Sequence, residues 1–120
     1  MAYLRREKEI VEMDFPLNKV WNAIPKAIAS LEWTVEKADE PRHFMKTKTK
    51  GAFMAYSSTL SIEAIAVAEN TTRVNVTAET PVTTITGIVD FGRTRERIDS
   101  FLMALMQQLG VGKPGSENVE

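Results

Sequence analysis

The sequence lacks cysteine, long apolar runs and a dominant charge, and each absence excludes a class of protein. With no Cys in 120 residues, disulfide frameworks and thiolate chemistry are excluded, and a reducing cytoplasm is the expected compartment. The apolar runs fall far short of the ~18–20 residues of a membrane span, and the N-terminus has no apolar segment typical of a signal peptide. A net charge of −1 supplies no field to attract nucleic acid or an anionic membrane.

Residues that perform catalysis or bind metals are also scarce. His43 is the only histidine, and with no orienting carboxylate or nucleophile beside it we interpret it as a structural or surface residue. The segment from Asp90 to Gly92 spells the kinase metal-binding tripeptide, but no phosphate loop accompanies it, so a helix cap is the better interpretation. An acid–base cluster of Asp90, Glu96 and Asp99 is weighed against a charge-paired face, which the neighbouring arginines favour. We therefore expect no enzyme, cofactor or metal site.

What the chain does contain is typical of one globular domain. Apolar residues make up 43% and charged residues 26% of the sequence, which is ordinary for a folded protein of this length. We predict a single α+β domain over residues 8–110. The Gly-, Pro- and Glu-containing segment 111–120 is predicted to be a disordered tail.

The first half of the chain alternates between strand and helix periodicity. Residues 1–7 are polar and predicted to be loose, and a period of two over 11–15 predicts the first strand. Residues 17–31 follow helical spacing, but Pro25 lies inside the pattern at a cost of ~3 kcal/mol. We therefore expect either a kink near Asn22 or two short helices. Trp33 and Val35 begin a second strand, and residues 42–50 form a third.

The second half predicts two more strands and a long helix. In segment 57–67 the apolar phase flips to Ile65 and Val67, which predicts a β-bulge or a bend. A fifth strand surrounds Val74 and Val76, and the Thr-rich segment 80–89 is predicted to be a connection. From Asp90 the chain turns helical, with Gly110 ending the helix. One face of this helix is apolar, and its residues are Phe91, Ile98, Phe101, Leu102, Leu105 and Leu109.

These elements predict a curved, antiparallel, five-stranded sheet in the order β-α-β-β-β-β-α, packed on the long C-terminal helix. One side of the sheet should be wet and the other covered by both helices. The predicted wet residues are Glu12, Glu36, Lys46, Lys48, Glu63 and Arg73. The predicted dry residues are Met13, Trp33, Met45, Leu60, Ile62, Val74 and Val76.

This order, with the break at Pro25 and the bent fourth strand, resembles the START-like helix-grip superfamily that includes the birch pollen allergen. It also resembles the half domains of TATA-box-binding proteins. The helix-grip resemblance implies that the first strand pairs with the fifth and that a cavity lies between sheet and helix. A local likeness, through Thr72 to Val76 and the Asp90 turn into the Arg97 helix, links the chain to small prokaryotic domains of unknown function.

The candidate ligand-binding residues are apolar and adaptable. Methionine and aromatic side chains suit apolar pockets, although they more commonly fill cores. The candidates are Trp33, Met45, Phe53, Met54, Tyr56, Met103 and Met106. The segment from Phe53 to Tyr56 is explained either by the mouth of a pocket or by self-association into a homo-oligomer.

Two functions from different classes remain. The first is non-enzymatic binding of a small apolar ligand between the sheet and the final helix. The second is a protein–protein interaction module with a filled core, acting through the sheet face or the 52–56 connection. A basic strip of Lys46, Lys48 and Lys50 has only Phe44 for base stacking, which argues against nucleic acid as the partner.

Overall fold

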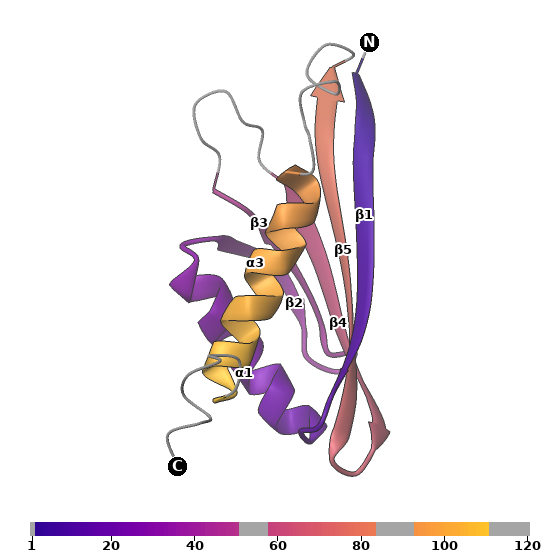
Figure 1. The fold of residues 1–120 in the computed structure, drawn as a ribbon, viewed down its shortest axis with the longest axis vertical. Coiled ribbons are helices and arrows are strands. Elements are labelled where there is room, and N and C mark those ends of the chain that lie inside the picture. Colours follow the sequence, from indigo (N-terminus) through magenta and orange to yellow (C-terminus); the bar gives the residue numbers. More distant parts are fainter. Residues whose placement is uncertain (1, 51–57, 84–92, 111–120) are drawn as a thin grey trace.

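The computed structural model describes residues 2–50, 58–83 and 93–110, and it has the predicted order of elements (Figure 1). The five strands form one antiparallel sheet in the order β1-β5-β4-β3-β2. The first strand therefore pairs with the fifth, as the helix-grip resemblance implied. Both helices lie on one side of the sheet and leave the other open. The elements are β1 (Ala2–Met13), α1 (Leu17–Ser30), β2 (Thr34–Asp39), β3 (Phe44–Lys48), β4 (Thr59–Ala68), β5 (Thr71–Thr83) and α3 (Arg93–Gln108).

Strand β1 is much longer than the sequence predicted. It pairs with β5 along its whole length, from Ala2 opposite Thr83 to Met13 opposite Thr72. The prediction of a loose segment over residues 1–7 is therefore wrong from Ala2 onward. The charged residues that hid the strand are tolerated because β1 is an edge strand, where charged side chains are common.

Strand β5 also runs into a segment predicted to be a connection. It continues through Pro81 to Thr83, so that prediction is wrong for its first four residues. Strand β4 begins at Thr59, opposite Glu79, so β5 beyond Glu79 has only β1 beside it within the described residues. A strand with one neighbour accommodates a residue that lacks an N–H, which explains why Pro81 does not end it. Residues 84–89 lie outside the described part of the chain.

Helix α1 is a single helix with Pro25 inside it, so the alternative of two short helices is wrong. Pro25 is exposed, whereas Val20, Ile24 and Ile28 are at most 1% exposed. Each such side chain contributes about 1.5–3 kcal/mol when fully buried. The apolar stripe therefore outweighs the ~3 kcal/mol that an internal proline costs.

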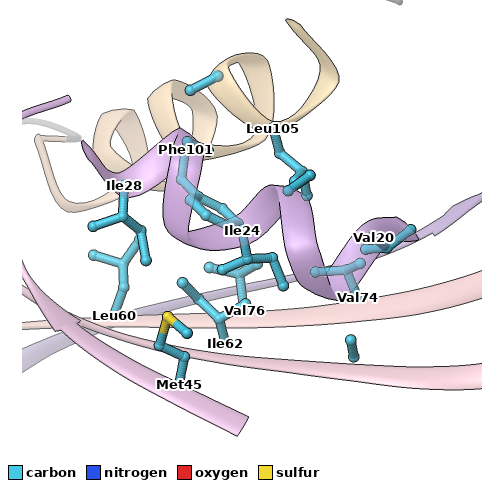
Figure 2. Close-up of a cluster of buried hydrophobic side chains, with 14 of the residues drawn as sticks. Val20, Ile24, Ile28, Met45, Leu60, Ile62, Val74, Val76, Phe101 and Leu105 are labelled. Atoms are coloured by element: carbon cyan, nitrogen blue, oxygen red, sulfur yellow. The ribbon is translucent and has the colours of Figure 1, made fainter. Parts of the chain in front are cut away.

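The core lies between the sheet and the two helices (Figure 2). In this view Ile28 lies above Leu60, Ile24 above Ile62 and Val76, and Val20 above Val74. The side chains that α3 contributes, Ile98, Phe101 and Leu105, are 0% exposed and belong to the same cluster. The predicted packing of the final helix against the sheet is therefore confirmed.

The opposite side of the sheet is wet, as predicted. Lys46 and Lys48 are exposed there, and neighbouring strands are joined by ion pairs. These pairs are Arg6 with Glu79 at 2.6 Å and Arg73 with Glu12 at 3.0 Å.

The predicted bulge in β4 is confirmed by a shift in register between Ala66 and Ala68. Ile65 and Val67 are nevertheless exposed. The flip of apolar phase therefore marks the exposed end of the β4–β5 hairpin and not a second buried face.

The described end of α3 is also as predicted. Gly110 follows the helix with a φ of +88°, and its N–H donates to the carbonyl of Gln107 at 3.1 Å. Glycine adopts this left-handed conformation without steric cost, so it is suited to end a helix. The predicted N-cap Asp90 lies outside the described residues.

Candidate functional site

A chain of buried hydroxyl groups lies where α3 begins, between that helix and the sheet. The hydroxyl of Ser58 is 2.5 Å from that of Thr80, which is 2.9 Å from that of Thr94. Ser58 precedes β4, Thr80 lies on β5 and Thr94 lies in the first turn of α3, and all three are at most 1% exposed. Buried hydroxyls are stable only when they are hydrogen-bonded, and this chain satisfies them mutually.

Two further residues complete this group. The side chain of Thr49 accepts a hydrogen bond from the Ser58 N–H at 2.8 Å, and Arg97 Nη1 donates to Ser58 Oγ at 2.7 Å. We call Thr49, Ser58, Thr80 and Thr94 the hydroxyl cluster. Helical spacing assigns Arg97 to the solvent face of α3, opposite Ile98 and Phe101, but Arg97 is partly buried and bonded to this cluster. That assignment is therefore corrected.

The helix-facing side of the sheet changes character along its length. Val74 and Val76 of β5 pair with Ala64 and Ile62 of β4, and all four are buried among apolar residues. Farther along β5 in the same phase are Ala78 and then Thr80. The side chains therefore become smaller and then polar toward the beginning of α3. Figure 2 places α1 over the apolar part, where Ile28 reaches Leu60.

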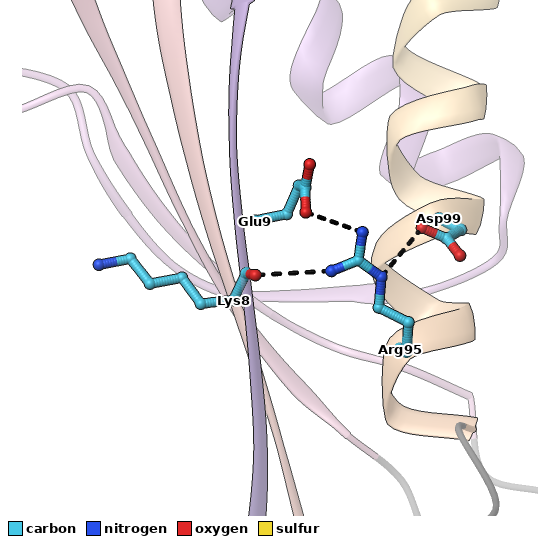
Figure 3. A network of polar contacts seen from close by, with 4 residues as sticks. All are labelled: Lys8, Glu9, Arg95 and Asp99. Atoms are coloured by element: carbon cyan, nitrogen blue, oxygen red, sulfur yellow. Dashed lines mark hydrogen bonds and ion pairs between the residues drawn. The ribbon is translucent and has the colours of Figure 1, made fainter.

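Charged side chains connect helix α3 to the edge strand β1 (Figure 3). Arg95 Nη2 donates to Glu9 Oε1 at 2.8 Å, and Arg95 Nε lies 3.4 Å from Asp99 Oδ1. Its Nη1 also reaches the backbone carbonyl of Lys8 at 3.5 Å. The hydrogen bond to Glu9 is the main reason that the pKa of Arg95 is raised. Asp99 is therefore charge-paired, as predicted, and α3 is joined to edge strand β1.

The structure distributes the predicted ligand-binding residues over several places. Met45 is buried in the core and Trp33 packs partly buried against it. Met103 is 61% exposed, whereas Met106 is half-buried. The remaining predicted residues, Phe53, Met54 and Tyr56, lie outside the described part of the chain.

Met103 and Met106 line two different surface hollows. Met106 borders one of about 270 Å³, together with Met13, Phe15 and Leu109. Met103 borders another of about 310 Å³, between the end of α1 and α3. Neither lining includes a residue of the hydroxyl cluster. The residues predicted from the sequence therefore do not converge on one site within the described structure.

The single histidine packs against an aromatic ring. Its ring meets Trp21 edge to face with the centroids 5.3 Å apart, and Trp21 Nε1 donates to Glu40 Oε1 at 2.8 Å. Among the residues that the structure describes, no group of three or more acidic or histidine side chains is placed to hold a metal ion. Within the same residues, no helix is long and apolar enough to cross a membrane.

The hydroxyl cluster was missed by the sequence reasoning, although a signal for it was present. Val74, Val76 and Ala78 occupy every second position, so the same period places Thr80 on the covered side of the sheet. The Thr-rich composition of segment 80–89 favoured a connection and hid this continuation. The partners of Thr80 come from distant parts of the chain, and no local pattern announces them.

The sheet wrapped around a C-terminal helix is the helix-grip fold. No protein-family model and no curated protein matches the sequence, but solved structures of this fold do. Norcoclaurine synthase from Thalictrum flavum is similar with a TM-score of 0.65 and 10% identity, covering 90% of this chain and 87% of that chain. Ara h 8.0201 has a TM-score of 0.66 and 9% identity, covering 91% and 100%.

A bacterial protein shares the same architecture. The Zhui aromatase/cyclase from Streptomyces sp. R1128 has a TM-score of 0.52 and 12% identity, covering 88% of each chain. At such identities the likeness shows the fold alone. These structures support the helix-grip resemblance and give no support to the TATA-box-binding one. The local likeness to small prokaryotic domains stays a prediction.

Proposed function

We propose that the protein binds a small, largely apolar ligand between the sheet and α3, without catalysing a reaction. The observation that carries this proposal is the change along strand β5 from valine to smaller side chains on its helix-facing side. Beyond Ile62 and Val76 the next residues of β5 in this phase are Ala78 and Thr80. Small side chains beneath a helix leave volume that a ligand can fill.

The walls of the proposed site come from three elements. Leu60 of β4, Ala78 of β5 and Ile98 of α3 are buried and apolar, and the hydroxyl cluster bounds them at the end where α3 begins. Helix-grip proteins are a precedent, since one of the similar norcoclaurine synthase structures is a complex with dopamine and hydroxybenzaldehyde. Met45, Trp33, Phe53, Met54, Tyr56, Met103 and Met106 remain the ligand-contacting residues predicted from the sequence.

Filling the proposed volume tests the proposal. In the wild type we expect a neutral apolar dye such as Nile red to bind, and native mass spectrometry of freshly purified protein to detect a co-purifying small molecule. Ala78→Leu should abolish dye binding while leaving the free energy of unfolding nearly unchanged, because the added side chain occupies the ligand space. The control is Ala66→Leu, at an exposed position of the same sheet, which should leave dye binding intact.

The opposite result would exclude the proposal. If the region is solidly packed, the wild type binds no dye, and Ala78→Leu destabilises the protein by about 1–3 kcal/mol through overpacking. Fluorescence titration measures the dye affinity of the wild type and of Ala78→Leu, and urea unfolding measures the free energy of unfolding of the same two proteins.

The open side of the sheet favours the second candidate, an interaction module. Ile10 is 51% exposed there, and Lys46 and Lys48 lie on the same side. An apolar side chain within a polar, charged surface is a common feature of protein interfaces. If this surface mediates self-association, analytical ultracentrifugation should find a dimer that Ile10→Asp dissociates. A concentration-independent monomer would argue against self-association.

A further inference from the structure

We infer that strand β1 pairs with β1 of a second copy of the chain, antiparallel and centred on Ile10, so that the two sheets become continuous. This pairing rests on the second candidate function, the interaction module, and is independent of the apolar ligand. It names the partner of that module and moves the contact from the open side of the sheet to its edge. The partner is a second copy because the side chains of β1 complement themselves about one residue.

Strand β1 has a neighbour on one side only. It pairs with β5 from Ala2 to Met13, and no other described strand lies beside it. In an antiparallel ladder, alternate residues direct their N–H and C=O groups to opposite sides, so half of these groups in β1 point away from β5. Arg95 Nη1 approaches the carbonyl of Lys8 only at 3.5 Å, and a carbonyl has a second lone pair. The edge can therefore accept another strand by backbone hydrogen bonds.

Three side chains of β1 are exposed on the open side of the sheet, namely Lys8, Ile10 and Glu12. Figure 3 shows Lys8 pointing away from α3 and Glu9 toward it, and the period of two places Ile10 and Glu12 with Lys8. Among the described residues, the Lys8 side chain forms no ion pair. Arg73 bonds Glu12 only through Oε2, so Oε1 can accept from a further cation. Ile10, which is 51% exposed, lies between an available cation and an available anion.

The order of these side chains is complementary to itself when the strand is reversed. If Ile10 lies opposite Ile10 of the second copy, Lys8 lies opposite Glu12 of that copy, and Glu12 opposite its Lys8. Side chains directly opposite each other have Cβ atoms about 4.5–5.5 Å apart, so an apolar contact is flanked by two ion pairs. A centre at Glu9 places Lys8 opposite Ile10, and a centre at Val11 places Ile10 opposite Glu12. Of these registers, only the one centred on Ile10 joins both an apolar pair and two ion pairs.

The helix-facing side of β1 is compatible with the same register. There Glu9 lies opposite Val11 of the second copy. Glu9 already pairs with Arg95 at 2.8 Å, so no unpaired carboxylate is brought against Val11, which packs partly buried against the core. Over residues 7–13 this register places no two like charges opposite each other. Neither side of the strand therefore opposes the pairing.

A single introduced thiol tests the register, because the chain has no cysteine of its own. In Ile10→Cys the thiol lies opposite its copy, with Cα atoms about 4.5–5.5 Å apart, a distance that a disulfide bridges. We expect mild oxidation with copper phenanthroline to link this variant into a covalent dimer. Lys8→Cys is the control, since its two thiols lie about 13 Å apart along the strand and should not be linked. A mixture of Lys8→Cys and Glu12→Cys should be linked.

Charge reversal tests the complementarity without a covalent bond. We expect sedimentation equilibrium to find a reversible monomer–dimer equilibrium for the wild type. Lys8→Glu should raise the dimer dissociation constant at least about tenfold, because symmetry places like charges opposite each other twice. The double variant with Lys8→Glu and Glu12→Lys should restore association, since both ion pairs form with their signs exchanged.

Lys46→Glu is the matched control for these variants. It reverses the charge of an exposed lysine on the same side of the sheet but on β3, away from the edge formed by β1. It should leave the dissociation constant unchanged. Thermal unfolding followed by circular dichroism would establish that each variant is folded.

The opposite outcomes separate this pairing from the proposed functions. Equal cross-linking of Ile10→Cys and Lys8→Cys, or a double variant that associates as weakly as Lys8→Glu, would overturn the edge pairing. A wild-type dimer that Lys46→Glu dissociates would also overturn it and leave association through the open side of the sheet standing. A concentration-independent monomer would exclude self-association of either kind. Binding of Nile red is measured separately, so none of these results decides the apolar ligand.

Discussion

The two ends of the helix-facing side of strand β5 bury different kinds of side chain. At Val76, strand β5 meets Ile24 and Ile62 in a purely apolar environment (Figure 2), and four residues later Thr80 is just as buried among hydroxyls. The apolar end gains free energy from every atom removed from water. The hydroxyl end gains little, because its hydrogen bonds mostly replace those it made with water. The two ends of this face therefore differ in the free energy that burial contributes and not in how deeply their side chains are buried.

The largest effect should come from the apolar end. Phe101→Ala removes a fully buried ring, and we expect a loss of about 3–5 kcal/mol in the free energy of unfolding. Urea unfolding followed by circular dichroism measures it. Met103→Ala on the same helix is the control, and its exposed side chain should change stability by no more than about 0.5 kcal/mol. Comparable losses from both variants would contradict the packing described here.

A hydroxyl moved into the apolar end should have the next largest effect. Val76→Thr keeps the shape of the side chain but buries a hydroxyl near Ile24 and Ile62, and a loss of about 1–3 kcal/mol follows from its unmet hydrogen bonds. The measurement is again urea unfolding. A variant as stable as the wild type would show that water reaches this part of the core.

The reverse exchange should have a smaller effect. Thr80→Val removes the central hydroxyl of the cluster, so Ser58 and Thr94 each lose one hydrogen-bond partner. We expect a loss of about 1 kcal/mol in the free energy of unfolding. If Thr80→Val instead stabilises the protein, burial of the hydroxyl end costs free energy on folding, and the contrast between the two ends is larger than expected. A loss equal to that of Val76→Thr would remove the contrast between the two ends.

The smallest effect is expected for an exposed ion pair that lies outside both the apolar end and the hydroxyl end of β5. Lys50 Nζ lies 2.9 Å from Glu32 Oε1, and this hydrogen bond, followed by the charge of Lys50, lowers the pKa of Glu32 below 4.5. A carboxyl whose pKa is lower in the folded state stabilises the fold above its unfolded pKa. That contribution is lost as the pH falls through the folded pKa.

An NMR titration of the Glu32 carboxyl measures this shift directly. We expect its pKa to rise toward 4.5 in Lys50→Gln. The difference in melting temperature between the wild type and Glu32→Gln should be small near neutral pH and disappear in acid, since exposed ion pairs contribute little. A Glu32 pKa unchanged by Lys50→Gln would contradict the pairing.

Much of the fold was predictable because periodicity reports which side of an element is covered. The spacing of Ile98, Phe101 and Leu105 predicted the buried face of α3. The alternation of Val74 and Val76 predicted the buried face of β5. The candidate site was less predictable, because methionines and aromatics do not reveal whether they face a core or a hollow. Met45 proved buried and Met103 exposed, although both had been selected for the same chemical reason.

The amino-acid sequence by itself determined the order of the elements, the covered face of the sheet and the end of α3 at Gly110. These follow from short-range patterns, since side-chain period and backbone preference act within a few residues. Only the tertiary structure decided that β1 begins at Ala2, that β5 continues past Pro81, and that Arg97 turns inward to Ser58. Each depends on a partner that is distant in sequence, and the free energy of such a contact exists only once the chain has folded.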